Sequence, residues 1–362
     1  HAYEYSDCWV EDSRLVALNA RDAAMRGASI LTRTRAVATI RHPDHWEIVT
    51  EGPAGRQVHK ARALVNAAGP WVEEVIRHVA HIDTTEGVRL VRGSHIVTRK
   101  LYDHDRCYFL QGTDGRIIFA IPYEQDFTLI GTTDQDHHGA PGEAFCTDEE
   151  RDYLLTFASQ YFAKPVTAAD VVWTYSGVRP LYNDGAKSAT AATRDYVLSV
   201  DTDAAPLLNV FGGKITTHRR LAESALAKLG AWFPQAKGPW TARVALPGGD
   251  FPYDGVAALT QALKRHFPFL SDPWAARLIR AYGSEAPSLL GEATSAADLG
   301  RDFGATLTEA EVRWQMAHEF ARAAADVVWR RSKLGLRLTQ DQIAALDAFM
   351  VGLEAPTTGR IL

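Results

Sequence analysis

The sequence has few of the features that mark specialised protein classes. Its 362 residues contain only three cysteines, Cys8, Cys107 and Cys146, which are widely spaced and form no C-x-x-C pair. This pattern fits a reducing compartment and excludes a cysteine-based zinc site of the usual spacing. No apolar run reaches the ~18 residues typical of a membrane-spanning helix. A formal net charge of -5 argues against a general nucleic-acid-binding protein.

Common sequence signatures of catalysis are also missing. The chain contains no G-x-G-x-x-G, G-x-x-x-x-G-K-[ST], H-E-x-x-H or G-x-S-x-G motif. Short patterns therefore assign no reaction. What the chain does contain is 46% hydrophobic residues, without an excess of glycine or proline. That composition supports a large buried core, and the length predicts two or three domains.

The hydrophobic pattern changes twice along the chain. Residues 12–27 predict a helix, and residues 46–67 predict a hairpin followed by a short strand. Residues 86–136 are short β-rich runs separated by turn residues, which indicates an antiparallel sheet. From about Lys237 nearly every segment has helical period. We therefore predict an α/β (α+β) protein in three parts: residues 1–85 with 171–235, residues 86–170, and an all-helical domain of residues 236–362.

The segment from Phe211 to Leu229 combines a strand end, a glycine turn and a helix start. Gly212 and Gly213 allow a sharp turn and leave room for a ligand, and Lys214 follows them. We expect Thr216 or Thr217 to cap the helix that begins there. Such an end presents free N–H groups and partial positive charge to an anion or an electron-rich ring edge. A capped structural helix is the alternative that the segment alone leaves open.

Three cations are predicted to lie where strands end. Arg179 is placed in a Gly-Val-Arg-Pro turn after a strand, Arg194 at the start of another strand, and Lys214 in the glycine turn. If they converge, their charges and the forked arginine contacts suit a phosphate. Three unrelated surface cations, each paired with a carboxylate, are the alternative.

His95 is the histidine most suited to a role inside the β-rich part. It is either a buried structural histidine or a general base. The pair His137–His138 is expected to face solvent in a loop, and His78 and His81 lack a third metal ligand nearby in the sequence.

The order and spacing of several motifs resemble one enzyme family along essentially the whole chain. They are YSDCWVEDSRLV, VNAAGPWV, RLVRGSHIV, IGTTD, WTYSGVRPL, ATRDY, FGGKITTHRRLAE and a C-terminal stretch beginning DLGRDFGATL. Together they are similar to the FAD-dependent glycerol-3-phosphate dehydrogenases. The resemblance implies a partial Rossmann-like FAD-binding domain of the glucose/amino-acid oxidase type, an antiparallel substrate domain and a helical C-terminal domain.

The same resemblance implies a reaction and its partners. Family members oxidise sn-glycerol 3-phosphate to dihydroxyacetone phosphate by hydride transfer from C2 to flavin N5, and pass the electrons to quinone. They are cytoplasmic and bind peripherally to the inner face of the cell membrane. A homodimer is an oligomeric state that the resemblance allows, and no nucleic acid is expected as a partner.

The resemblance also assigns residues. Arg179, Arg194 and Lys214 are implied as the substrate cations, with Arg179 near the reacting C2 oxygen and His95 as acceptor of the hydroxyl proton. The implied cofactor-binding residues are Ala36 and Val37 near the adenine, Ala68 and Gly69 near the ADP portion, and Gly212, Gly213, Lys214, Ile215, Thr216 and Thr217 at the flavin pyrimidine edge.

The sequence departs from the family pattern at its beginning. Family members start with a strand and a G-x-G-x-x-G turn that binds the FAD pyrophosphate, followed by an acidic residue for the ribose. The 362 residues contain neither this strand and turn nor the acidic residue that follows them. We therefore expect a fragment that holds FAD weakly or not at all.

Three other functions remain open from the sequence. One is a glycerol-3-phosphate oxidase, which uses oxygen in place of quinone. Another is a different member of the amine and amino-acid oxidase superfamily, against which the three cations argue. The last is a non-catalytic fragment whose helical domain binds a membrane or a partner.

Overall fold

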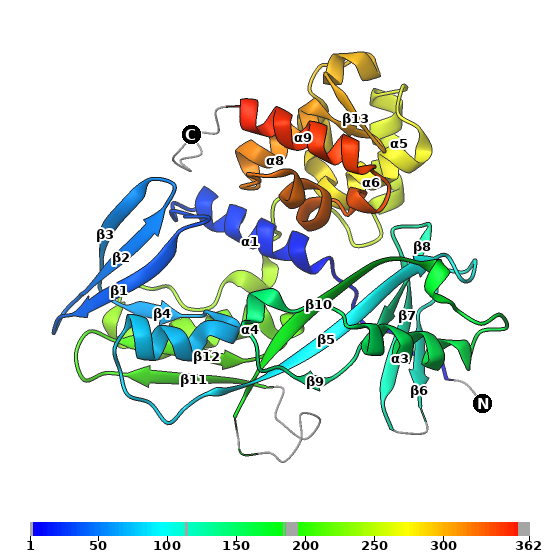
Figure 1. Cartoon of the computed structure of the whole chain (residues 1–362). Helices are drawn as coiled ribbons and strands as arrows, with labels where there is room; N and C mark the ends of the chain where they lie inside the picture. Colours follow the sequence, from blue (N-terminus) through cyan, green and yellow to red (C-terminus); the bar gives the residue numbers. More distant parts are fainter. Residues whose placement is uncertain (1–2, 113–114, 184, 186–194, 354–362) are drawn as a thin grey trace. The chain divides into compact units, whose positions relative to one another are not determined.

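The computed structural model describes residues 3–112, 115–183, 185 and 195–353. The chain divides into two compact units (Figure 1). One unit comprises Arg35–Ala242, and the other combines His1–Thr34 with Arg243–Leu362. Residues 1–34 thus belong with the C-terminal helices, whereas we expected them beside the strands. The three-part division predicted from the sequence remains a prediction.

A three-stranded antiparallel sheet opens the first unit. Its strands are β1 (Arg35–Arg41), β2 (Trp46–Gly52) and β3 (Gly55–Ala61), in the order β1-β2-β3. The predicted hairpin is therefore confirmed. The indole of Trp46 is fully buried and donates from Nε1 to the Pro206 carbonyl at 3.1 Å, so it joins this sheet to the segment around Pro206.

A second small sheet places two turns at one edge. Its strands are β11 (Tyr196–Asp201), β12 (Leu207–Gly212) and β4 (Leu64–Asn66), with β4 parallel to β12. Each parallel strand leads into helical turns: η1 (Gly69–Trp71), α2 (Val72–Glu74) and the π-helix η2 (Val75–Val79) after β4, and η5 (Ile215–Thr217) and α4 (His218–Lys228) after β12. Because the carboxyl ends of parallel strands meet at one edge, the two turns are neighbours.

The largest sheet is antiparallel, as predicted. Its order is β10 (Val171–Tyr182), β5 (Val88–Arg99), β8 (Phe127–Gly131), β7 (Ile117–Tyr123) and β6 (Tyr108–Gln111), and β9 (Gln135–Asp136) also pairs with β5. Helix α3 (Asp148–Ser159) lies against one face (Figure 1) and buries Leu154 and Phe157 against Ile96 and Ile118. Thr147 and Glu150 form a capping box that starts this helix.

Strand β10 differs from the sequence prediction. The Gly-Val-Arg-Pro segment does not turn; it continues the strand, and Arg179 pairs with Val91 while Pro180 pairs with Leu90. Strand β10 is at the edge of this sheet and pairs only with β5 in it. An edge strand tolerates Pro180, because the missing N–H need not pair with a second strand. Arg179 therefore points from a regular strand rather than from a flexible turn.

The other unit is mainly helical. Helix α1 (Asp12–Met25) joins α5 (Val256–His266), α6 (Asp272–Tyr282), η8 (Gly283–Glu285), α7 (Ala286–Leu290), η9 (Ala296–Leu299), α8 (Glu309–His318), η10 (Asp326–Arg331), η11 (Leu334–Leu336) and α9 (Gln340–Gly352). A small two-stranded sheet of β13 (Asp302–Gly304) and β14 (Leu307–Thr308) was not predicted. The hydrophobic core of this helical unit includes one cluster around Leu278 and another around Val327.

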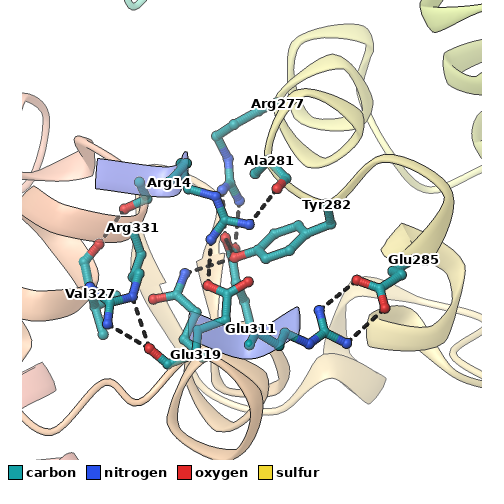
Figure 2. Close-up of polar contacts among 12 residues, drawn as sticks. Arg14, Arg277, Ala281, Tyr282, Glu285, Glu311, Glu319, Val327 and Arg331 are labelled. Carbon is teal, nitrogen blue, oxygen red and sulfur yellow. Dashed lines mark hydrogen bonds and ion pairs between the residues drawn. The ribbon is translucent and has the colours of Figure 1, made fainter. Parts of the chain in front are cut away.

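Buried charged groups dock α1 onto these helices (Figure 2). The Arg14 guanidinium pairs with Glu319 and also donates to the Ala281 carbonyl at 2.5 Å. Arg21 makes a forked pair with Glu285 at 2.5 and 2.7 Å. The side chains of Arg14 and Glu319 are only 8% and 0% exposed, so each charge depends on the other.

A second network of polar contacts lies beside the Arg14–Glu319 pair. Arg277 forms a forked pair with Glu311 at 2.7 Å, and the hydroxyl of Tyr282 donates to Glu311 at 2.8 Å. Gln315 donates to the same hydroxyl at 2.7 Å, and Arg331 donates to the Glu319 carbonyl at 3.0 Å from Nε. Burial raises the pKa of Tyr282, so its proton stays available for this bond.

Within the described parts of the chain, no helix has both the length and the apolar character needed to cross a lipid bilayer. Some C-terminal segments mix basic and aromatic residues, as helices at a membrane surface do. In the structure Phe267 is buried, Trp274 packs against the same core cluster, and Trp329 packs against the other. Core packing therefore accounts for these aromatic residues.

Replacing Glu319 by Gln should destabilise the helical unit by about 3–5 kcal/mol, because Arg14 would keep a buried charge without a counter-ion. Urea unfolding monitored by circular dichroism measures the change. Arg330→Ala is the control, since its pair with Asp326 is exposed and should contribute less than about 1 kcal/mol. Equal effects of the two substitutions would contradict the assigned role of the buried pair.

Candidate functional site

The pairing of β5 with β10 places the main predicted residues on one face of the large sheet. Tyr175 pairs with His95 and Arg179 pairs with Val91. Residues directly opposite each other, and those two apart along a strand, point to the same side. His95, Tyr175 and Arg179 therefore share one face, and α3 covers the other. The structure thus brings together the two residues predicted to act on the C2 hydroxyl.

The guanidinium of Arg179 is held in place on this face. Nη1 donates to Asp134 Oδ1 at 2.6 Å and Nη2 donates to Thr132 Oγ1 at 2.9 Å. A Cβ at Gly93 would lie 2.5 Å from Nη2, so glycine is needed for the arginine to lie against β5. The side chain is still 31% exposed. A fixed, partly exposed guanidinium is suited to bind an oxyanion with little loss of entropy.

The ring of His95 is fixed between two neighbours. It stacks on Tyr175 with ring centroids 4.9 Å apart and an interplanar angle of 5°. On its other side it lies over Gly131, where a Cβ would overlap the ring. The imidazole is partly exposed, and its orientation is set by packing.

Gly177 leaves the space between these side chains open. It lies on β10 between Tyr175 and Arg179, is exposed, and a Cβ there would meet no atom within 4 Å. A small polar molecule over Gly177 would therefore have a cation on one side and an imidazole across the sheet. A guanidinium binds oxyanions, and a neutral imidazole accepts protons.

Glu150 supports the segment that holds Arg179. The hydroxyl of Thr133 donates to Glu150 at 2.7 Å and accepts from the Ser94 backbone N–H at 2.9 Å. Arg92 pairs with the same carboxylate at 3.0 Å. Burial alone raises the pKa of Glu150, but the bonds from Thr133 and the Thr147 backbone outweigh it, and the pKa lies below its ordinary value. Glu150 is therefore a charged, buried anchor.

The glycine turn after β12 lies next to the end of β10. Gly212 has φ +65° and Gly213 has φ +97°, conformations that favour glycine. A Cβ at Gly212 would be 3.1 Å from the Asp195 carbonyl and 3.5 Å from that of Pro180. The glycine turn and the strand of Arg179 are thus in contact, and Lys214 is exposed two residues later.

Thr217 is the N-cap residue of α4, one of the two threonines predicted for that position. Its side chain makes no capping bond, because the Thr217 hydroxyl instead donates to the Lys214 carbonyl at 3.0 Å. The 3-10 turn η5 comes first, so the segment from Lys214 to Thr217 presents backbone rather than a capping side chain. The first N–H groups of a helix lack intrahelical partners and remain donors for a ligand.

The turn after β4 is built around a buried amide. Asn66 donates from Nδ2 to Asn209 Oδ1 and to the Val72 carbonyl, both at 3.0 Å. These bonds join the turn that carries Ala68 and Gly69 to β12. Gly69 has φ +56°, and a Cβ there would meet no atom within 4 Å. Asn209 was not predicted, because it lies inside an apolar run.

The remaining predicted residues are distributed as follows. Ala36 and Val37 lie in β1, where the register shifts between Ala36 and Ala38 and leaves Val37 as the extra residue of a bulge. Such residues have backbone groups free of ladder bonds. Arg194 lies outside the described residues. The roles of Tyr175, Thr132, Asp134 and Glu150 were missed, although Tyr175 lies in the WTYSGVRPL motif and Thr132 and Asp134 lie in the IGTTD motif.

Replacing Gly131 by Ala should destabilise the sheet unit by about 1–3 kcal/mol, because His95 is confined by Tyr175 and cannot yield to the new methyl group. Gly177→Ala is the matched control on the same face and should change the free energy of unfolding by less than about 1 kcal/mol. Urea unfolding of both variants provides the comparison. A stable Gly131→Ala variant would show that the ring is not confined.

Comparisons with known proteins identify the family. The family model for FAD dependent oxidoreductases matches residues 1–219, and that for the C-terminal domain of alpha-glycerophosphate oxidase matches residues 239–353. The aerobic glycerol-3-phosphate dehydrogenase of Escherichia coli is 43% identical over 96% of this chain and 70% of its own length. The D-erythritol 1-phosphate dehydrogenase of Brucella abortus is 43% identical over 95% of this chain and 69% of its own length.

A solved structure has the same fold. The glycerol-3-phosphate dehydrogenase from Bacillus halodurans, complexed with FAD, superposes with a TM-score of 0.75 at 21% identity, over 97% of this chain and 74% of that one. The predicted fold class, the enzyme class and FAD as the cofactor of the family are confirmed. The chain belongs to the glycerol-3-phosphate dehydrogenases among the FAD-dependent oxidoreductases.

Proposed function

We propose that this chain carries the substrate face of an enzyme that oxidises sn-glycerol 3-phosphate to dihydroxyacetone phosphate. One observation carries the proposal. His95 on β5 and Arg179 on β10 lie on one face of this strand pair, and the space above Gly177 on β10 is open. The two relatives at 43% identity, one acting on glycerol 3-phosphate and one on D-erythritol 1-phosphate, support a phosphorylated polyol as substrate.

The chain's own residues bind and orient the substrate in this proposal. Arg179 would contact the substrate near its C2 oxygen, and Lys214 would contribute positive charge from the adjacent glycine turn. Arg194 is assigned to the same group of cations. His95 would accept the hydroxyl proton as C2 loses its hydride, because stacking on Tyr175 keeps the ring directed at one position.

The described residues fit the flavin end of FAD. When bound, FAD supplies the two-electron acceptor for the C2 hydride. Gly212, Gly213 and the backbone from Lys214 through Ile215 and Thr216 to Thr217 would lie at the pyrimidine edge, where helix-end N–H groups stabilise negative charge. Ala68 and Gly69 would lie near the ADP portion, and the bulge at Ala36 and Val37 near the adenine. The 362 residues include no G-x-G-x-x-G motif for the pyrophosphate.

Quinone is the electron acceptor that we propose, with peripheral contact at the inner face of the cell membrane. A homodimer is part of the same proposal. Oxygen is the alternative electron acceptor. The match of residues 239–353 to the C-terminal domain of alpha-glycerophosphate oxidase supports this alternative. Protein loaded with FAD should reduce a quinone-like dye with glycerol 3-phosphate and consume little oxygen. Rapid oxygen consumption would instead identify an oxidase.

Replacing His95 by Asn should lower kcat of the FAD-loaded protein by about 10²–10⁴-fold, because a general base would be lost. KM for glycerol 3-phosphate should change far less. Steady-state dye reduction measures both constants. His137→Asn, a substitution in an exposed loop, should leave both unchanged. Unchanged turnover in the His95 variant would overturn its assignment as the base.

Replacing Arg179 by Met should raise KM for glycerol 3-phosphate by at least about tenfold, because a charge-assisted forked contact contributes roughly 1.5–3 kcal/mol. Arg56→Met is the control, because Arg56 lies on β3 with a side chain that is 67% exposed. The same assay with D-erythritol 1-phosphate compares the two phosphorylated polyols through kcat/KM. An unchanged KM in the Arg179 variant would place the substrate elsewhere.

A further inference from the structure

The turn between β1 and β2 gathers metal-binding side chains outside the site described above. It carries His42, Asp44, His45 and Glu47 within six residues. The His42 N–H donates to the His45 carbonyl at 2.9 Å and closes the turn. The two imidazole rings stack with centroids 4.3 Å apart and an interplanar angle of 9°. Nothing in the proposed oxidation uses these residues.

The ring nitrogens of this turn are positioned as ligands. His45 Nδ1 is hydrogen-bonded to Asp44 Oδ1 at 2.8 Å. Because a carboxylate only accepts, Nδ1 carries the proton and Nε2 of the neutral ring presents its lone pair. Nε2 of His42 and Nε2 of His45 are both buried and have no hydrogen-bond partner among the residues that the structure describes. Two such atoms in one turn are costly unless a ligand satisfies them.

Glu47 completes a set of three donors. One ligand atom from each of His42, His45 and Glu47 lies within 4.8 Å of the other two, and His45 Nε2 is 4.0 Å from Glu47 Oε1. Ligands of one Zn²⁺ at about 2.0–2.2 Å lie roughly 3.3 Å apart. Binding one ion therefore requires the donors to approach and the two rings to rotate out of their near-parallel stack, so that both Nε2 lone pairs point at the ion. Imidazole donors favour transition metals such as Zn²⁺ over Mg²⁺ and Ca²⁺, which prefer oxygen.

The surroundings resemble those of known metal ligands. A carboxylate on the far nitrogen of a metal-bound histidine fixes its tautomer and raises its basicity, and Asp44 has this position. Lys60 competes, because its Nζ lies 3.0 Å from Glu47 Oε1. The Lys60 side chain is 68% exposed, so it can leave Glu47 at little cost.

The turn is anchored to the rest of the unit, away from the glycine turn. The Ala205 N–H donates to the His42 carbonyl at 3.0 Å, and Trp46 is fixed by Pro206. Residues 205 and 206 precede β12, whereas Gly212 and Gly213 end it. The donors therefore lie at the opposite end of β12 from the proposed flavin-binding turn.

From these contacts we propose that His42, His45 and Glu47 bind one divalent transition-metal ion. The ion stabilises the connection between the β1–β2 turn and the β11–β12 turn, and it takes no part in the redox reaction. No step of the proposed oxidation depends on it, so the two proposals can fail separately.

Isothermal titration of the untagged 362-residue chain with Zn²⁺ tests the proposal. The expected result is one Zn²⁺ per chain, with a cobalt(II) complex whose visible spectrum indicates nitrogen and oxygen ligands. The double variant His42→Gln/His45→Gln should weaken Zn²⁺ binding by at least ~100-fold. The Asp44 side chain is 87% exposed, so Asp44→Asn should not disturb folding. This substitution should weaken Zn²⁺ binding by about 10–100-fold.

Two further variants separate this site from adventitious binding. Lys60→Met should tighten Zn²⁺ binding several-fold, because Glu47 loses its competing partner. His137→Gln/His138→Gln removes an adjacent histidine pair elsewhere and should leave the dissociation constant unchanged. The proposal is overturned if the chain binds no Zn²⁺, or if binding is lost with His137 and His138 rather than with His42 and His45. Circular dichroism of each variant confirms that it is folded.

Discussion

The antiparallel pairing of β5 with β10 is the contact on which the candidate site depends. It sets His95 opposite Tyr175 and Arg179 opposite Val91, so one register decides which side chains share a face. A slip of one residue would move Arg179 to the face that α3 covers. The opposite face of the same pair fixes the register, because Ile96 must remain in the core beneath α3. Packing on one side of the sheet thus determines the chemistry on the other.

Glycine has a constructive role on this face. Gly93 gives the Arg179 guanidinium its place, Gly131 gives the His95 ring its place, and Gly177 leaves the space between them open. Each does so by the absence of a side chain at a position where the neighbouring group or a ligand needs the volume. The strands are rigid, so they position the polar side chains of the site more precisely than loops would.

The sequence was informative where local pattern decides structure. The hairpin, the antiparallel sheet, the strand–glycine turn–helix of Phe211–Leu229 and the helical C-terminal segments all follow from periodicity and turn residues. It misled where tertiary contacts decide. The Gly-Val-Arg-Pro segment reads as a turn, yet Pro180 is accommodated because β10 is an edge strand.

Long-range polar partners could not be predicted at all. Arg14 and Arg21 look like solvated charges of an amphipathic helix, but their partners lie 305 and 264 residues further along the chain. Glu150 on α3 is a similar case, because its partners are Arg92 on β5 and Thr133 in the segment between β8 and β9. Only motif order, carried by resemblance, linked His95, Arg179 and Lys214 before the fold was known.

The docking of α1 has a consequence for synthesis of the chain on the ribosome. Arg14 and Arg21 of helix α1 are made more than 260 residues before their partners Glu319 and Glu285. At about 5–20 residues per second, the helix waits on the order of 15–60 s for its partners. During that time Arg14 and Arg21 are hydrated charges that discourage aggregation. The residues that later form a buried ion-pair network thus help to keep the unfinished chain soluble while residues 35–242 are being made.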